Sequence, residues 1–265
     1  MARVLITGCS TGFGRASAVE LTKRGHEVIA TARRPETLED LDVADRIRLD
    51  VDDDASVAQA VASAGPVDAL VNNAGFGVVG PIEHVPPAEI RRMLETNLLG
   101  AIRMTQAVLP QMRERGRGTI VNVTSLAGRV TGPLGGTYAA TKHALEAISE
   151  SLHYEVGHFG IRVRIVEPGY FATDFQGKEP RFGLDGAPYD ELDKEWEVAF
   201  EKLRGGGDAP GPEPVAQIIA DAVEATEPKL RWPVGGDAEM VLGARATLDD
   251  EAFEATMREV LGLTW

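Results

Sequence analysis

Short apolar runs rich in β-branched residues alternate with longer helical patterns along most of this 265-residue chain. Apolar runs of this kind, without polar alternation, are typical of strands that are buried on both faces of a sheet. Strand, helix and strand units repeated in this way need right-handed crossovers and build a parallel sheet. The pattern therefore predicts an α/β fold with a doubly wound parallel sheet of about seven strands and helices on both faces. The expected strands, the first six of them buried on both faces, are residues 4–6, 28–31, 46–49, 69–71, 119–123, 162–166 and 230–234.

The helical patterns divide the chain into a regular part and a less regular one. The regular part has expected helices at residues 15–24, 55–64, 87–113 and 138–159. The segment 176–214 is rich in glycine, proline and charge, with an expected helix at 191–203. We interpret this segment as a lid over a substrate, with a hinge at the three glycines 205–207, or as a surface excursion whose amphipathic helix packs on the core; the two are compatible. A helix at 214–225 and a helical C-terminal extension at 237–265 complete one domain, residues 1–265.

Composition argues against several classes of protein. The formal net charge is −14 and the basic residues are scattered apart from short groups, so no nucleic-acid partner is expected. Cys9 is the only cysteine, which excludes an internal disulfide and favours a reducing compartment; within a glycine-rich turn it is expected to be a small packed thiol. No set of His, Cys or carboxylate residues has the spacing of a metal site. Because no apolar stretch of about eighteen residues occurs, we expect a cytoplasmic protein with no membrane partner.

A glycine-rich turn follows the first expected strand and opens the first long helix. It reads Thr-Gly-Cys-Ser-Thr-Gly-Phe-Gly over residues 7–14. Glycines in this place allow a tight turn and let backbone N–H groups and the helix N-terminus approach a pyrophosphate. The spacing differs from the commonest Gly-x-Gly-x-x-Gly fingerprint, but the position between strand and helix favours a dinucleotide site. The candidate contacts are Gly8, Ser10, Thr11, Gly12, Phe13 and Gly14.

The end of the second expected strand indicates which dinucleotide is bound. An Asp or Glu about twenty residues after the glycine turn would bind the ribose 2′-hydroxyl of NAD. This chain instead has Ala32 followed by Arg33 and Arg34, and two guanidinium groups can grip a 2′-phosphate. We therefore expect NADP(H), with NAD(H) as the alternative. Further candidate cofactor contacts are Asp50 and Val51 near the adenine and Asn73, Ala74 and Gly75 beside a ribose.

Tyr138 and Lys142 are four residues apart in an expected helix and therefore share one face. An ammonium near a phenol stabilises the phenolate and lowers a pKa that is ordinarily about 10, which makes the phenol a better proton shuttle at neutral pH. Hydride transfer to a carbonyl leaves charge on oxygen, so a site for it needs a hydrogen-bond donor and an acid. Ser125, thirteen positions before Tyr138, and Tyr138 itself can supply these two roles.

Together these motifs resemble the short-chain dehydrogenase/reductase family, in its single-domain branch, over about residues 3–175. The residues that carry the resemblance are 7–14, 72–75, Asn97, Ser125, Tyr138, Lys142, Pro168 and Gly169. The resemblance implies a Rossmann-type fold in which Tyr138 is the general acid/base, Lys142 lowers its pKa and holds the nicotinamide ribose, and Ser125 bonds the substrate oxygen. It also implies that Asn97 helps to place a water leading protons toward the lysine. By the same resemblance, Pro168, Gly169 and Thr173 lie by the nicotinamide.

Apolar side chains in two segments predict the class of substrate. If these side chains face the nicotinamide, they form a large apolar pocket suited to a hydrophobic ketone, aldehyde or secondary alcohol. A weaker likeness is to the branch that includes estradiol 17-beta-dehydrogenase and the retinol dehydrogenases. Because the cellular NADP pool is usually held reduced, carbonyl reduction is the expected direction. The candidate side chains are Val130, Leu134, Phe175, Phe182, Leu184, Tyr189, Trp196 and Phe200.

Two alternatives to an NADP-dependent reductase stay open at this point. One is an NAD-dependent alcohol dehydrogenase, and the other is a dinucleotide-binding sensor that retains the fold without chemistry. The family resemblance also implies a homodimer or homotetramer assembled through the two long helices at 87–113 and 138–159.

Overall fold

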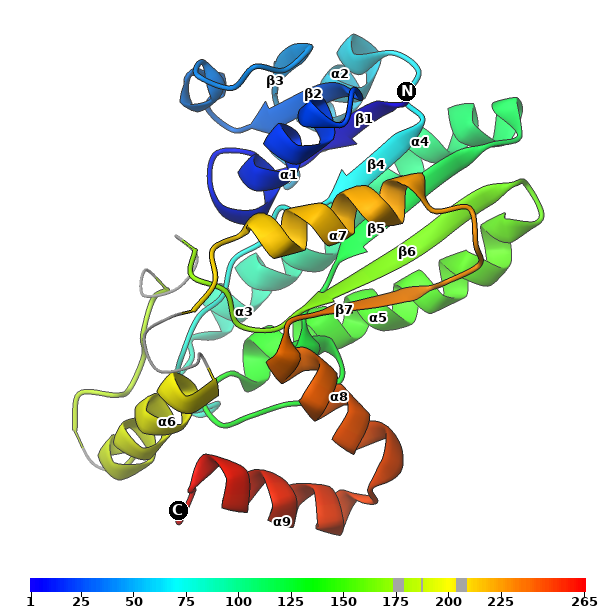
Figure 1. Ribbon diagram of the computed structural model, residues 1–265. Helices are drawn as coiled ribbons and strands as arrows, with labels where there is room; N and C mark the ends of the chain where they lie inside the picture. The colour runs from blue at the N-terminus through cyan, green and yellow to red at the C-terminus, as the bar shows by residue number, and fades with distance from the viewer. Residues whose placement is uncertain (174–178, 187, 204–208) are drawn as a thin grey trace.

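The computed structural model describes residues 1–173, 179–186, 188–203 and 209–265. Within these residues seven parallel strands form one sheet in the order β3-β2-β1-β4-β5-β6-β7 (Figure 1). The strand order reverses between β1 and β4, which confirms the predicted doubly wound α/β fold. The strands are β1 (Arg3–Ile6), β2 (Glu27–Ala32), β3 (Asp45–Arg48), β4 (Ala69–Asn72), β5 (Gly118–Val123), β6 (Ile161–Pro168) and β7 (Arg231–Val234).

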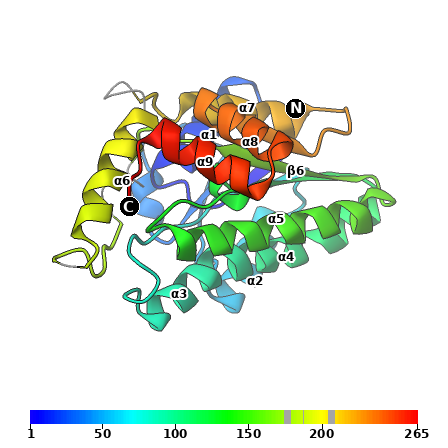
Figure 2. The ribbon, with the colours of Figure 1, turned by 90° about the horizontal axis from the view of Figure 1, so that it is seen from below.

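Helices cover both faces of the sheet (Figure 2). On one face α1 (Gly12–Lys23) packs beside α7 (Glu213–Glu224). On the other face lie α2 (Asp54–Ala64), α4 (Ala101–Arg115) and α5 (Gly136–Gly157). Successive side chains of a strand point to opposite faces, so Val4 and Ile6 enter one apolar core and Leu5 enters the other.

The third strand differs from its expected burial. The sequence pattern predicts that residues 46–49 are buried on both faces, but Asp45, Arg46 and Arg48 are exposed. Leu49, just beyond the strand, is the buried residue of this stretch. The prediction was wrong because β3 is an edge strand that pairs only with β2 among the described strands, and its outer side meets solvent.

The single helix expected at 87–113 is divided by a segment of wider helical turns. It consists of α3 (Pro87–Leu94), the π-helical segment η2 (Glu95–Gly100) and α4. Short π-helical insertions are rare and frequently mark functional sites. This one carries Asn97, whose side chain is buried.

Three further helices gather beyond the carboxyl ends of the central strands: α6 (Asp190–Leu203), α8 (Gly236–Thr247) and α9 (Asp250–Leu261) (Figure 1). α6 packs against α9, and Lys202 Nζ donates to the carbonyl of Leu261 at 3.3 Å. Glu195 accepts hydrogen bonds from the backbone N–H groups of Thr264 and Trp265. α6 is therefore held by the C-terminal end of the chain.

The expected lid is only partly described. The hinge proposed at 205–207 and the side chain of Phe175 lie outside the described residues. Closure of the segment 176–214 over a substrate consequently stays a prediction. None of the described helices is long and apolar enough to cross a membrane.

Candidate active site

The glycine turn between β1 and α1 is shaped by close backbone contacts. Gly8 and Gly12 have positive φ angles of 74° and 58°, a conformation that residues with a Cβ rarely adopt. A Cβ at Gly14 would lie 2.4 Å from the carbonyl oxygen of Gly8, so the start of α1 presses directly on the turn. The positive end of the helix is thereby brought to the turn, where it favours an anionic group.

Thr7 and Asn73 fasten this turn to the loop after β4. The Thr7 hydroxyl accepts hydrogen bonds from the backbone N–H groups of Asn73 and Ala74, each at 3.0 Å. Asn73 Nδ2 donates to the carbonyls of Thr7 and Gly8 at 2.9 and 3.2 Å. Asn73 therefore holds the turn itself, beside any contact with a cofactor. In the sequence, only the position of Thr7 directly before the glycines indicated that it fastens the turn.

Cys9 is a packed residue of the same turn, as expected. Its side chain is fully buried and its thiol donates to the carbonyl of Ile6 at 3.3 Å. Burial raises the pKa of Cys9 to about 12, which keeps the thiol protonated and unreactive.

A cavity of about 600 Å³, the cofactor cavity, runs from the glycine turn to Lys142. Its volume and its position at a helix N-terminus suit a dinucleotide. The expected cofactor residues that line it are Gly8, Ser10, Thr11, Gly12, Phe13, Arg33, Asp50, Val51, Asn73, Ala74, Gly75, Tyr138 and Lys142. Gly14, Arg34 and Thr173 do not line it, and Pro168 and Gly169 line the neighbouring cavity instead. Thr173 nonetheless lies near the turn, 3.8 Å from the position of a Cβ at Gly12.

Charged side chains gather at the end of the cofactor cavity near β2. Arg33 is exposed and lines the cavity directly after the buried Ala32. Asp52, which the sequence analysis did not single out, lines the same end. Burial raises the pKa of Asp52, against the opposing effect of a hydrogen bond from the Thr96 hydroxyl at 2.9 Å. This end of the cavity therefore presents both a guanidinium and carboxylates.

Tyr138 lies near the start of α5 and lines both the cofactor cavity and a second, neighbouring cavity. Burial raises the pKa of Tyr138 above its ordinary value, although a hydrogen bond with Ser125 acts in the opposite direction. Lys142 Nζ lies 5.8 Å from the centroid of the tyrosine ring. Burial therefore outweighs the hydrogen bond with Ser125 in this structure, and the lowering of the Tyr138 pKa by Lys142 stays a prediction.

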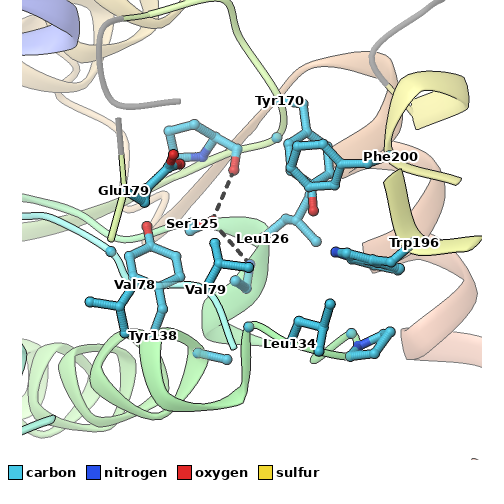
Figure 3. Close-up of a pocket in the computed structure, with 18 of the residues that line it drawn as sticks. Val78, Val79, Ser125, Leu126, Leu134, Tyr138, Tyr170, Glu179, Trp196 and Phe200 are labelled. Carbon is cyan, nitrogen blue, oxygen red and sulfur yellow. Dashed lines mark hydrogen bonds between the residues drawn. The ribbon is translucent and has the colours of Figure 1, made fainter. Parts of the chain in front are cut away.

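Ser125 follows β5 and is fixed by two backbone contacts. Its hydroxyl accepts a hydrogen bond from the N–H of Ala127 at 3.1 Å and donates to the carbonyl of Pro168 at 3.4 Å. The first contact caps the 3-10 turn η3 (Leu126–Gly128). Ser125, Tyr138 and Glu179 point into one space in Figure 3. The structure thus brings the serine to the tyrosine, as the sequence predicts.

Lys142 is buried one helical turn after Tyr138, with 5% of its surface exposed. Its Nζ donates to the carbonyl of Val123 at 2.9 Å. Burial lowers the pKa of Lys142 to about 8, and the carboxylate of Glu146 opposes this shift. The ammonium lies at the wall of the cofactor cavity.

Asn97 connects the loop after β4 to α5. Its Oδ1 accepts from the N–H of Phe76 at 3.0 Å, and its Nδ2 donates to the carbonyl of Phe76 at 2.8 Å and to the Thr141 hydroxyl at 3.0 Å. A Cβ at Gly75 would lie 3.1 Å from Asn97 Oδ1 and 3.7 Å from Lys142 Nζ. Asn97 therefore sets the position of this loop beside Lys142, while its expected part in a water relay stays a prediction.

The second cavity, which we call the reaction cavity, has a volume of about 480 Å³. Of the apolar residues expected around a substrate, Leu134, Trp196 and Phe200 line it. Val130, Phe182, Leu184 and Tyr189 do not line it. Phe182 packs with the buried Val78, Val85 and Met93, and Tyr189 lies 6.3 Å from Trp265 between ring centroids. Because Tyr138 belongs to the walls of both cavities, the two meet at its side chain.

Some residues of the cofactor cavity carried no signal in the sequence. Phe76, Arg92 and Glu179 line it, and the guanidinium of Arg92 lies 4.6 Å from the Phe76 ring centroid. Each comes from a different segment without a recognisable motif, so only the fold brings them together. Across the described ranges, no group of three His, Cys, Asp or Glu residues could hold a metal ion.

Comparisons with known proteins agree with this architecture. A family model for short chain dehydrogenases matches residues 2–182. Retinol dehydrogenase 8 of Homo sapiens is 38% identical over 251 residues, which cover 86% of this chain and 79% of that protein. The 3-ketodihydrosphingosine reductase of Bacteroides thetaiotaomicron is 34% identical over 263 residues, 96% of each chain. The crystal structure of a short-chain dehydrogenase from Streptomyces avermitilis has a TM-score of 0.82 and 38% identity, covering 99% of this chain and 98% of that one.

The doubly wound sheet with a cavity at its glycine turn is the architecture of a dinucleotide-binding α/β protein. The matched family model and relatives show that the chain belongs to the short-chain dehydrogenase family, which confirms the predicted resemblance. Members of this family bind a nicotinamide dinucleotide and act on small substrates.

Proposed function

We propose that this protein is an NADP(H)-dependent oxidoreductase that interconverts a hydrophobic ketone or aldehyde and the corresponding alcohol, with Tyr138 as general acid/base. The observation that carries the proposal is the position of Tyr138 in the shared wall of the cofactor and reaction cavities. A phenol at this junction can reach a substrate oxygen while the reacting carbon faces the cofactor. The names of two relatives concern a keto reductase and an alcohol dehydrogenase, which supports this reaction type.

Ser125, Tyr138 and Lys142 each have a separate role in the proposed reaction. The bound dinucleotide supplies or accepts the hydride. The Ser125 hydroxyl turns its hydrogen from the Pro168 carbonyl to the substrate oxygen, where negative charge develops. The raised pKa of Tyr138 keeps its phenol protonated at neutral pH, so Tyr138 can donate a proton to that oxygen during carbonyl reduction. Lys142 holds positive charge beside the phenol in the reverse direction, when Tyr138 must accept a proton.

The reaction cavity supports an apolar substrate. Leu134, Trp196 and Phe200 are among the residues that line it, and Leu126 lies between Ser125 and the aromatic residues (Figure 3). Burial of hydrocarbon against these side chains would hold the substrate, while Ser125 and Tyr138 orient its oxygen. Reduction is the proposed cellular direction, because the NADP pool is usually held reduced.

The preference for NADP(H) is assigned to Arg33, because Arg33 lines the cofactor cavity and Arg34 does not. Replacing Arg33 with alanine should weaken NADPH binding about tenfold to a hundredfold and change NADH binding little, since a charge-assisted bond to the 2′-phosphate is lost. Fluorescence titration with both dinucleotides measures this. Arg34→Ala is the matched comparison, and the larger loss is expected at Arg33. Equal affinities of the wild-type protein for NADPH and NADH would contradict the preference and favour the NAD-dependent alternative.

Substitution of Tyr138 by phenylalanine tests the reaction itself. Loss of the general acid should lower kcat by about a hundredfold to ten-thousandfold while NADPH still binds. Tyr154→Phe is the matched control, because Tyr154 lies on the same helix with 83% of its surface exposed. Full activity in Tyr138→Phe would sink the mechanism. Tight NADPH binding by the wild-type protein with no turnover across aliphatic, aromatic, steroid and retinoid carbonyls would instead favour the sensor.

A further inference from the structure

A separate apolar cavity of about 400 Å³, the outer cavity, lies between α6, α9 and the loop that follows Ser125. Its walls come from elements that are far apart in the sequence. The side chains that contribute to it include Val130, Leu192, Val241, Phe253, Met257 and Leu261. Its volume is within the range of small-molecule sites. Neither Ser125, Tyr138 nor Lys142 lines it.

The outer cavity and the reaction cavity share a wall. Tyr170, Trp196 and Pro133 are among the residues that line both. In Figure 3, Tyr170 and Trp196 lie across the reaction cavity from Tyr138. The centroid of the Phe200 ring is 4.2 Å from that of Tyr170 and 5.9 Å from that of Trp196. The division between the two cavities therefore includes two aromatic side chains, Tyr170 and Trp196, which can turn.

Trp196 meets the loop at Gly132, which also lines both cavities. A Cβ at Gly132 would lie 2.5 Å from Trp196 Cη2, so the edge of the indole rests directly on the glycine. A slender, flexible chain could pass this edge after a small rotation of the indole.

The chemistry of the walls favours a hydrocarbon occupant. Among the described side chains that line the outer cavity, none has a buried polar atom without a hydrogen-bond partner. Glu254 and Arg258, the charged residues of the lining, pair with each other at 2.9 Å and are 66% and 48% exposed. Most of the lining side chains are apolar, so a polar ligand would find few groups to replace its hydration, whereas a hydrocarbon would gain by leaving water.

We propose that the outer cavity receives the aliphatic tail of a long-chain ketone, aldehyde or secondary alcohol whose oxygen lies at Tyr138. This inference rests on the proposed function, because Tyr138 fixes the position of the oxygen. Trp196 then marks the point where the chain leaves the reaction cavity. Met257, half-buried on α9, contacts the far part of the chain. Substrates with a long chain should be preferred to short ones with the same reacting group.

The test is reduction of butanone and decan-2-one with NADPH by the wild-type protein and by Met257→Trp. An indole at position 257 would fill the outer cavity and exclude methylenes from it. We expect the ratio of kcat/KM for the long ketone to that for the short one to fall by at least about tenfold. Met240→Trp is the matched control, because Met240 lies on α8, is 46% exposed and lines neither cavity. Its ratio should equal that of the wild-type protein.

Binding without turnover gives a second measurement. Calorimetric titration without NADP(H) should show tighter binding of decan-2-ol than of butan-2-ol, and Met257→Trp should abolish the difference. If folded Met257→Trp keeps the chain-length preference, the tail site is overturned even when both ketones are reduced. Length-dependent binding that Met257→Trp removes, together with no turnover of either ketone, would instead overturn the proposed function and leave the tail site standing. Phe253→Trp fills the same cavity should Met257→Trp fail to fold.

Discussion

The cofactor side and the substrate side of Tyr138 are built from different kinds of contact. On the cofactor side the contacts are made to the backbone: the position of a Cβ at Gly14 is 2.4 Å from the Gly8 carbonyl oxygen, and the Thr7 hydroxyl accepts from the backbone N–H groups of the facing loop. On the substrate side, ring meets ring, with Tyr170 and Phe200 4.2 Å apart. A backbone contact cannot adjust without moving an element, whereas a ring can turn. The cofactor side is therefore suited to a single ligand, and the substrate side is suited to ligands of different shapes.

The two sides also keep their charges in different places. Lys142, at the wall of the cofactor cavity, is 5% exposed. On the substrate side Arg181 and Asp193, 2.6 Å apart, line the reaction cavity with side chains that are 44% and 16% exposed, and the pair of Arg258 and Glu254 lies at the surface. A buried charge lowers the stability of the fold. A protein keeps such a charge where function requires it.

The largest expected effect in this comparison comes from the buried charge of Lys142. Its pKa is about 8 in the folded protein and ordinarily 10.5. Between these two values the unfolded chain binds the additional proton at Lys142, so the contribution of Lys142 to the free energy of unfolding should rise with pH across this window, by about 3 kcal/mol in total. The raised pKa values of Cys9 and Tyr138 act in the opposite direction above about pH 9 in both proteins, so the contribution of Lys142 is read as the difference between the wild-type protein and Lys142→Met. Urea unfolding of both proteins at several pH values from 7.5 to 10.5 measures the difference.

Lys194→Met, which removes an exposed lysine on α6, is the control, because it measures what loss of one surface lysine does to the pH dependence of unfolding. If the free energy of unfolding depends on pH in the same way in the wild-type protein and in Lys142→Met, burial of the Lys142 charge has no cost in stability. The cofactor side and the substrate side would then not differ in this respect.

An added methyl group at Gly14 has the next largest expected effect. It would meet the carbonyl oxygen of Gly8 and the side-chain amide of Asn73, each 2.4 Å away. Because the backbone must shift, Gly14→Ala should destabilise the fold by about 1–3 kcal/mol and weaken NADPH binding about tenfold or more. Thermal unfolding and NADPH titration measure the two effects. Gly157→Ala is the control, because a Cβ there meets nothing within 4 Å and should stabilise α5 slightly.

The sequence predicts the cofactor side of Tyr138 better than the substrate side. The glycine turn and the Tyr138–Lys142 pair are local patterns, so their residues could be named and their cavity located. Asn97 could be named, but its hydrogen bonds to Phe76 and Thr141 depend on a π-helical segment that no periodicity indicates. The direction of the Tyr138 pKa could not be predicted, because burial depends on neighbours from other segments.

The substrate side was less predictable for a physical reason. Helical spacing on α6 identified Trp196 and Phe200 as apolar residues of one face, but not the element that this face would meet. The outer cavity exists because α9 lies against α6, a contact between residues that are far apart in the chain. For Phe182 the prediction and the structure differ. Phe182 was expected to line the substrate pocket, but its side chain packs beside Met93.

The smallest expected effect provides the sharpest test of the comparison. Gly132→Ala adds the same methyl group as Gly14→Ala at a similar distance, 2.5 Å, but the atom it meets belongs to the Trp196 side chain. Because the indole can turn, the cost in stability should stay below about 1 kcal/mol. The turned ring should alter the passage to the outer cavity and change the long-to-short ratio of kcat/KM a few-fold. Thermal unfolding and the two-ketone assay measure these outcomes, and Trp196→Phe in the same chain should relieve the contact. A loss of stability as large as that of Gly14→Ala would mean that the substrate side is no more adjustable than the cofactor side.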